Sequence, residues 1–94
     1  MKKFFYRVEV GDSLAKVAKK LGVPVKVIIK QNNLIREIEA GDLLYIESPL
    51  SAKTYIVKPC DTLKSIAKKF NKSQREIQDI NMIDYVYFSM LIYV

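Results

Sequence analysis

The feature that most constrains this chain is a ten-residue stretch that occurs twice. Residues 12–21 (DSLAKVAKKL) return forty-nine residues later as residues 61–70 (DTLKSIAKKF). In both copies the apolar residues are spaced i, i+3, i+4 and i+7, which predicts one face of a helix. We expect the preceding oxygen-bearing side chains to cap that helix; they are Asp12, Ser13, Asp61 and Thr62. Gly22 and Asn71, residue types that tolerate a left-handed conformation, predict its end. The chain therefore contains two copies of one small unit.

The residues around the repeat predict the rest of the unit. Residues 4–10 alternate like a half-buried strand, with Phe4, Tyr6, Val8 and Val10 on one face. A second short helix is expected over residues 25–32, ended by Asn32 and Asn33 as turn residues, and a second strand over residues 43–46. In the second unit, Ser73 and Glu76 form a capping box at the corresponding helix start.

Each unit thus reads strand, helix, helix, strand. We predict an α+β fold of two βααβ units, each a two-stranded antiparallel sheet with two helices packed on one face. The expected boundaries are residues 1–48 for the first unit, 49–54 for the linker and 55–94 for the second unit. One residue is missing from the last loop of the second unit, so that Val86 aligns with Ile38.

Composition and charge limit the possible partners. Half of the residues are hydrophobic and 28% are charged, which is typical of a soluble globular protein. The net charge of +6 is divided evenly, because residues 1–48 and 49–94 each carry +3. This excess favours acidic partners without choosing among them. The chain begins without a signal peptide pattern and contains no stretch long enough to span a membrane, so we expect no membrane insertion.

The cysteine and histidine content argues against several kinds of chemistry. Cys60 is the only cysteine, and the chain has no histidine. We therefore expect no intrachain disulfide, no metal site and no activated thiol nucleophile. The acidic residues form no convincing catalytic pair. We expect no catalytic residues and no cofactor.

Two in-register patterns carry a family resemblance. Residues 6–47 contain Tyr-x-Val-x-x-Gly-Asp-Ser-Leu-x-x-Val-Ala-x-x-Leu-Gly-Val, then Asn-x-Leu and Ala-Gly-Asp-x-Leu-x-Ile, and residues 55–94 repeat much of this. The pattern resembles the lysin motif (LysM) domain. The second copy is degenerate, because Cys60 and Ser89 replace the glycines represented by Gly11 and Gly41. We expect these positions to need positive φ, so that a side chain there is strained or blocks part of the groove.

The resemblance implies non-catalytic binding of N-acetylglucosamine-containing glycan, namely peptidoglycan or chitin-type chains, in a shallow groove between two loops. Carried onto the first unit, the implied site residues are Gly11, Asp12, Ser13, Leu14, Leu34, Ile35, Arg36, Glu37 and Ile38. In the second unit they are Asp61, Thr62, Leu63, Ile83, Asp84, Tyr85 and Val86. The first unit is expected to be the better site.

Several alternatives stay open. The leucines and capping residues have structural roles as well, and the aromatic loop of Tyr85, Tyr87 and Phe88 could stack on sugars or cover the other unit. Nucleic acid is not an expected partner, because no motif supports it. The main alternative function is a structural protein of a spore or cell-envelope assembly, with homo-oligomers formed through the C-terminal edge strand. A cell wall or spore envelope location is expected, with the mother-cell cytoplasm as the other possibility.

Overall fold

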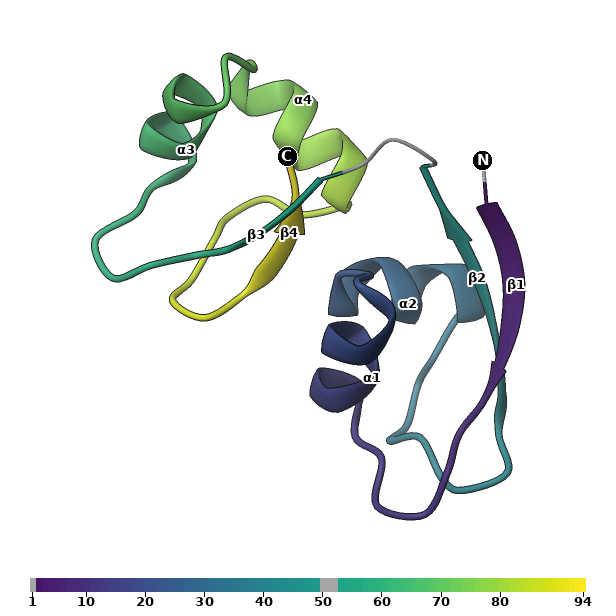
Figure 1. Cartoon of the computed structure of the whole chain (residues 1–94). Coiled ribbons are helices and arrows are strands. Elements are labelled where there is room, and N and C mark those ends of the chain that lie inside the picture. The colour runs from purple at the N-terminus through teal and green to yellow at the C-terminus, as the bar shows by residue number, and fades with distance from the viewer. Residues whose placement is uncertain (1, 50–52) are drawn as a thin grey trace.

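The structure is a computed structural model that describes residues 2–49 and 53–94. The first unit contains β1 (Lys2–Arg7), α1 (Leu14–Leu21), α2 (Val25–Asn32) and β2 (Leu43–Ser48). The second contains β3 (Thr54–Ile56), α3 (Leu63–Lys69), α4 (Gln74–Asn81) and β4 (Leu91–Tyr93). In each unit the two helices lie on one side of an antiparallel pair of strands (Figure 1). The α+β fold of two βααβ units is confirmed, whereas residues 50–52 of the expected linker lie outside the described residues.

The alternation of β1 explains the core of the first unit. Phe4 pairs with Ile46 and Tyr6 with Leu44, and these side chains face the helices. The strand stops earlier than predicted, although Val8 still exchanges hydrogen bonds of 2.8 Å with Gly41 and Asp42. Val10 was expected on the inner face, and this is wrong, because it is 92% exposed. The chain has by then entered the turn at Gly11, whose φ of 87° ends the alternation.

The ends of the helices largely follow the sequence signals. The side chains of Ser13 and Thr62 accept hydrogen bonds from the backbone N–H three residues on and cap α1 and α3. Ser73 and Glu76 form the predicted capping box of α4. Gly22 and Asn71 have φ of 68° and 55°, as their residue types indicated.

An asparagine joins the second helix of each unit to its last strand. Asn32 Nδ2 donates to the carbonyls of Ile28 and Tyr45, and its Oδ1 accepts from the N–H of Tyr45. Asn81 makes the same three bonds to Ile77 and Tyr93. Asn32 was expected to be a turn residue together with Asn33, but it lies in α2, and Asn33, with φ of 51°, ends the helix. The aligned asparagines instead fix the helix on the sheet.

The two units pack together through the outer face of the β3–β4 sheet. Tyr93 is 2% exposed and belongs to the buried cluster of the first unit, whereas its neighbour Ile92 belongs to that of the second. The first unit presents buried apolar residues at the α1–α2 corner, namely Val23, Pro24 and Val27. The corresponding residues of the second unit, Lys72, Ser73 and Glu76, are exposed. Only the first unit therefore offers an apolar surface at this corner.

The equivalent outer face of the β1–β2 sheet is open. Phe5 and Leu43 are 64% and 52% exposed, and the Phe5 ring lies 5.4 Å from that of Tyr45. Tyr45 aligns with Tyr93, yet its hydroxyl donates to Glu47 at 2.9 Å. The Tyr93 hydroxyl is buried with no hydrogen-bond partner among the described residues. Burial raises the pKa of Tyr93, and the nearby Ser48 hydroxyl offsets part of that rise. No helix in the described part of the chain is long and apolar enough to cross a membrane.

Candidate functional site

The loop before α1 is held by the carboxylate of Asp12. Its Oδ2 accepts hydrogen bonds from the Tyr6 hydroxyl at 2.6 Å and from the backbone N–H of Glu9 at 2.9 Å. Its Oδ1 lies 3.4 Å from Lys20 Nζ. These contacts, the Tyr6 hydrogen bond first, lower the pKa of Asp12. The predicted capping role is therefore wrong for Asp12, because Ser13 caps the helix and the aspartate turns back to close its own loop.

The second unit repeats this arrangement. Asp61 accepts from the Tyr55 hydroxyl and from the N–H of Lys58, and Lys69 Nζ lies 3.3 Å from the same hydroxyl. The hydrogen bond from Tyr55 is the main cause of the lowered pKa of Asp61. Asp61 is thus a loop anchor as well, and its predicted capping role is wrong for the same reason.

The loop between α2 and β2 is braced by an arginine–aspartate pair. Arg36 donates through two nitrogens to the two oxygens of Asp42, at 3.1 and 3.2 Å, and also to the carbonyl of Glu37 at 2.7 Å. The guanidinium of Arg36 is the main cause of the lowered pKa of Asp42. A bidentate pair of this kind fixes both partners in a plane. It leaves Ile35 at the tip of the loop, 98% exposed.

The loop and the helices enclose a shallow groove. The groove measures about 480 Å³ and is lined by Leu14, Ile29, Leu34, Ile35, Arg36 and Glu37. Five of these six were among the residues carried over from the family. Ile29, in α2, was not among the residues that the resemblance implied. Gly11, Asp12 and Ser13 do not line the groove, and Ile38 is 8% exposed and lies in the core.

The corresponding residues of the second unit are placed differently. Ile83 is 7% exposed, and Leu63 and Val86 pack against the same buried cluster. Asp84 and Tyr85 line, with Ile83, a pocket of about 100 Å³ whose other wall contains Lys26 and Lys30 of α2. The loop of the second unit therefore packs on Leu63 through Ile83 and Val86, and it shares a pocket with α2 of the first unit through Asp84 and Tyr85.

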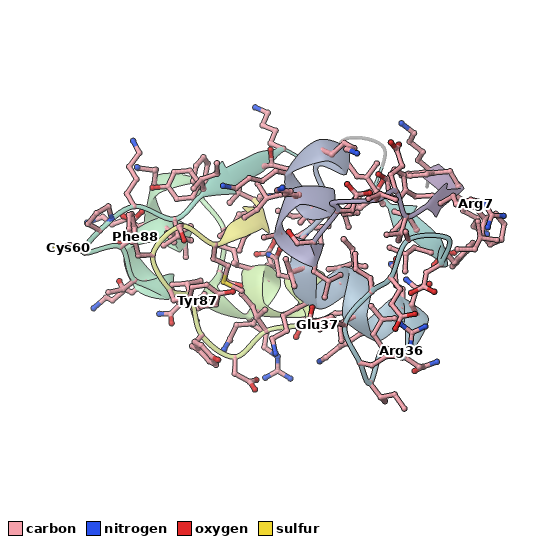
Figure 2. All side chains as sticks on the ribbon, turned by 90° about the horizontal axis from the view of Figure 1, so that it is seen from below. Arg7, Arg36, Glu37, Cys60, Tyr87 and Phe88 are labelled. Atoms are coloured by element: carbon pink, nitrogen blue, oxygen red, sulfur yellow. The ribbon has the colours of Figure 1, made fainter. Side chains whose placement is uncertain are left out.

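A second pocket lies between the two units. It measures about 210 Å³ and is lined by Ala15, Ala18, Lys19 and Val25 of the first unit and by Tyr87, Ser89, Met90 and Leu91 of the second. Tyr87 and Met90 line both inter-unit pockets, and we call the two together the inter-unit cleft. Figure 2 shows Tyr87 between Phe88 and Glu37 in projection, with Phe88 beside Cys60 at the outer end of the second unit. Tyr87 thus shares a pocket lining with the first unit while 49% of its surface stays exposed.

The two replaced glycines have the backbone conformation that their positions indicated. Cys60 and Ser89 have φ of 71° and 73°, close to the left-handed values of Gly11 and Gly41. A Cβ added at Gly11 or Gly41 would meet no atom within 4 Å. Cys60 and Ser89 therefore introduce backbone strain in the second unit. At Gly11 and Gly41 in the first unit, an added side chain would point into open space. Within residues 2–49 and 53–94, no cluster of acidic and sulfur side chains could hold a metal ion.

Known proteins resemble the chain over most of its length. It is 29% identical over 103 residues to the probable peptidoglycan endopeptidase LytE of Bacillus subtilis (strain 168), an alignment that covers 93% of this chain and 31% of LytE. The crystal structure of the spore cortex-lytic enzyme SleL of Bacillus megaterium QM B1551 matches 96% of this chain, with a TM-score of 0.49 and 25% identity. SleL of Bacillus cereus matches all of it, with a TM-score of 0.47 and 23% identity.

This chain spans less than a third of LytE and 22% of either SleL chain. The model of the LysM domain matches residues 6–47 and again residues 55–85. LysM domains are binding modules that generally recognise peptidoglycan and related N-acetylglucosamine glycans. Because the two matches together cover far more than half of the sequence, the chain belongs to the LysM domain family.

Proposed function

We propose that this chain binds an N-acetylglucosamine-containing glycan in the groove of its first unit, without cleaving it. The family and the peptidoglycan endopeptidase name of LytE support the class of ligand. The observation that carries the proposal is the braced loop: the Arg36–Asp42 pair holds Ile35 fully exposed beside an apolar groove. Covering a large exposed apolar side chain with a ligand contributes favourably to the free energy of binding, and a loop that is already fixed loses little conformational entropy when the ligand binds.

The chemistry of the groove suits an N-acetylated sugar. Leu14, Ile29 and Leu34 provide an apolar floor for the acetyl methyl group. Arg36 and Glu37 provide a charged donor and an acceptor for the amide and the hydroxyl groups of the sugar. The groove is open and shallow, which matches a polymer that passes across the surface.

The same lining argues for binding without hydrolysis. Glycoside hydrolysis ordinarily needs two carboxyl groups that flank the scissile bond. Glu37 is the only acid among the six lining residues of the groove. Of the nearby loop acids, Asp12 and Asp42 are engaged by hydrogen bonds within their own loops, and the Glu39 carboxylate lies 3.8 Å from Arg36.

The test is a titration of the chain with N-acetylglucosamine oligomers, followed by backbone amide shifts. We expect the amides of residues 34–37 and Leu14 to shift, and Ile35→Ala to weaken binding about tenfold, because three apolar carbons lose their contact. Val10→Ala is the matched control, since Val10 is also an exposed loop residue of the first unit but does not line the groove. Unshifted amides at millimolar oligomer would refute the proposal. Release of new reducing ends from peptidoglycan would refute its non-catalytic part.

A further inference from the structure

The groove of the first unit and the inter-unit cleft lie along the same two helices. Ile29 of α2 lines the groove, and Val25, four residues earlier, lines the cleft. Residues four apart are neighbours on one helix face. On α1, Leu14 lines the groove and the next residue, Ala15, lines the cleft. The spacing of Val25 and Ile29 on α2 therefore offers a path from the groove toward the second unit.

The far wall of the cleft is supplied by the last loop of the second unit. Tyr85 and Tyr87 are 61% and 49% exposed, and their rings lie 6.3 Å apart at 45°. The apolar faces of sugar rings pack well against tyrosine rings of this kind. Met90 and Leu91 form the apolar floor beneath Tyr87.

The cleft also carries donors for polar groups. Lys19, Lys26 and Lys30 line it, and Asp84 is the only acid among its lining residues. None of these lysines forms an ion pair in the described part of the chain. Their ammonium groups are therefore available to sugar hydroxyl and carbonyl oxygens.

The second unit, in contrast, lacks the features of an independent groove. Met90 stands where the first unit has Asp42, so the loop has no equivalent of the Arg36–Asp42 brace. Ile83, the counterpart of Leu34, is buried. Tyr85, in the same loop of the second unit, is exposed and lines the pocket shared with α2.

We propose that the groove and the inter-unit cleft form one continuous site for a longer N-acetylglucosamine chain, in which the second unit contributes Tyr87 instead of a groove of its own. The proposal rests on the proposed function of the groove. The chain would then have one extended binding site that spans both units, and not one equivalent site in each unit. Short oligomers then fill the groove alone, and only longer ones reach Tyr87.

The experiment compares an N-acetylglucosamine dimer with an octamer by calorimetry, using the whole chain and three variants. We expect Tyr87→Ala to weaken octamer binding about tenfold and to leave dimer binding unchanged, whereas Tyr87→Phe retains both affinities because the ring remains. Phe88→Ala is the matched control, since Phe88 is 64% exposed on the same loop but does not line the cleft. Urea unfolding curves of each variant check that the fold is retained.

The possible results separate the two proposals. If the dimer shifts the amides of residues 34–37 but Tyr87→Ala leaves octamer affinity unchanged, the extended site is wrong and the groove stands. The same holds if Tyr87→Ala weakens dimer and octamer equally, or if Phe88→Ala matches its effect. If neither oligomer binds the unmodified chain, both proposals fail together.

Discussion

The buried asparagine of the second unit gives the sharpest stability prediction. Asn81 is fully buried and makes three hydrogen bonds of 2.8, 2.9 and 2.7 Å, two of them to the backbone of Tyr93. Asn81→Ala leaves the N–H and the carbonyl of Tyr93 without these partners. Each buried group left unpaired costs about 1–3 kcal/mol, so we expect a loss of about 3–4 kcal/mol, a large part of the stability of a small protein.

The first unit provides the matched comparison. Asn32 makes the same three bonds, at 2.9, 2.9 and 2.7 Å, to Ile28 and Tyr45. It is only half-buried, and Tyr45 lies on the open outer face of its sheet. Water can therefore reach the freed groups, and we expect Asn32→Ala to cost about 1–2 kcal/mol.

The measurement is urea unfolding followed by far-UV circular dichroism. With a denaturant dependence of about 1–3 kcal/mol per molar urea, Asn81→Ala should lower the midpoint by on the order of 1–4 M. Because two units need not unfold in one step, the exchange rates of the Tyr45 and Tyr93 amides should be measured in both variants. Equal losses in the two variants would contradict the reasoning, since only burial distinguishes the two asparagines. A loss below about 1 kcal/mol for Asn81→Ala would do the same.

Three further predictions follow from the loops and the interface. Cys60→Gly should stabilise the second unit by about 0.5–1 kcal/mol in urea unfolding, because it relieves a positive φ, whereas Gly11→Ala should destabilise the first by a similar amount. The hydrogen bond from Tyr6 is the main cause of the lowered pKa of Asp12. The ionised Asp12 carboxylate therefore stabilises the fold at pH values above its ordinary pKa of 3.8, and this contribution is lost as the pH falls below that value. Asp12→Asn should accordingly make the urea midpoint decline less steeply at acid pH. Val27→Glu, which copies the glutamate of the second unit, should separate the units and increase the hydrodynamic radius measured by diffusion NMR. An unchanged radius would show that this corner does not hold them together.

Most of the fold could be predicted because local signals and the repeat agreed. The stripe of apolar residues, the caps Ser13 and Thr62 and the left-handed stop at Gly22 act within a few residues of one another. Such effects leave a readable pattern in one sequence. The duplicated copy confirmed each of them independently.

The errors lie where a side chain has two local choices. An aspartate before a helix can cap it or can bond backward into its own turn. Asp12 and Asp61 take the second choice, because a tyrosine hydroxyl six residues earlier and a turn N–H are both in reach. Only the folded turn between the first strand and the first helix of each unit brings Tyr6 and Tyr55 to that position. The pattern of Asp followed by Ser or Thr cannot distinguish the two outcomes.

The placement of the second unit's loop depends on contacts between units, which no local pattern encodes. Tyr45 and Tyr93 occupy the same position in the repeat, and each is bound to an asparagine through its backbone. Their surroundings differ because Val27 offers an apolar surface where Glu76 does not. The second sheet can therefore dock on the helices of the first unit, and the second unit has no matching apolar corner to offer.

The packing of the second sheet on the first unit is related to two differences between the units, namely the position of the last loop and the absence of an arginine–aspartate pair in it. Packing Tyr93 against the first unit brings Tyr87 and Met90 to α1 and α2, as the shared pocket lining shows. The same loop has a methionine where the first unit has Asp42, the partner of Arg36. A loop that packs against a neighbour no longer needs an internal brace to hold it open to solvent. Loss of the brace and packing against α1 and α2 therefore occur in the same loop, which agrees with our proposal that the second unit supplies a wall of its neighbour's site.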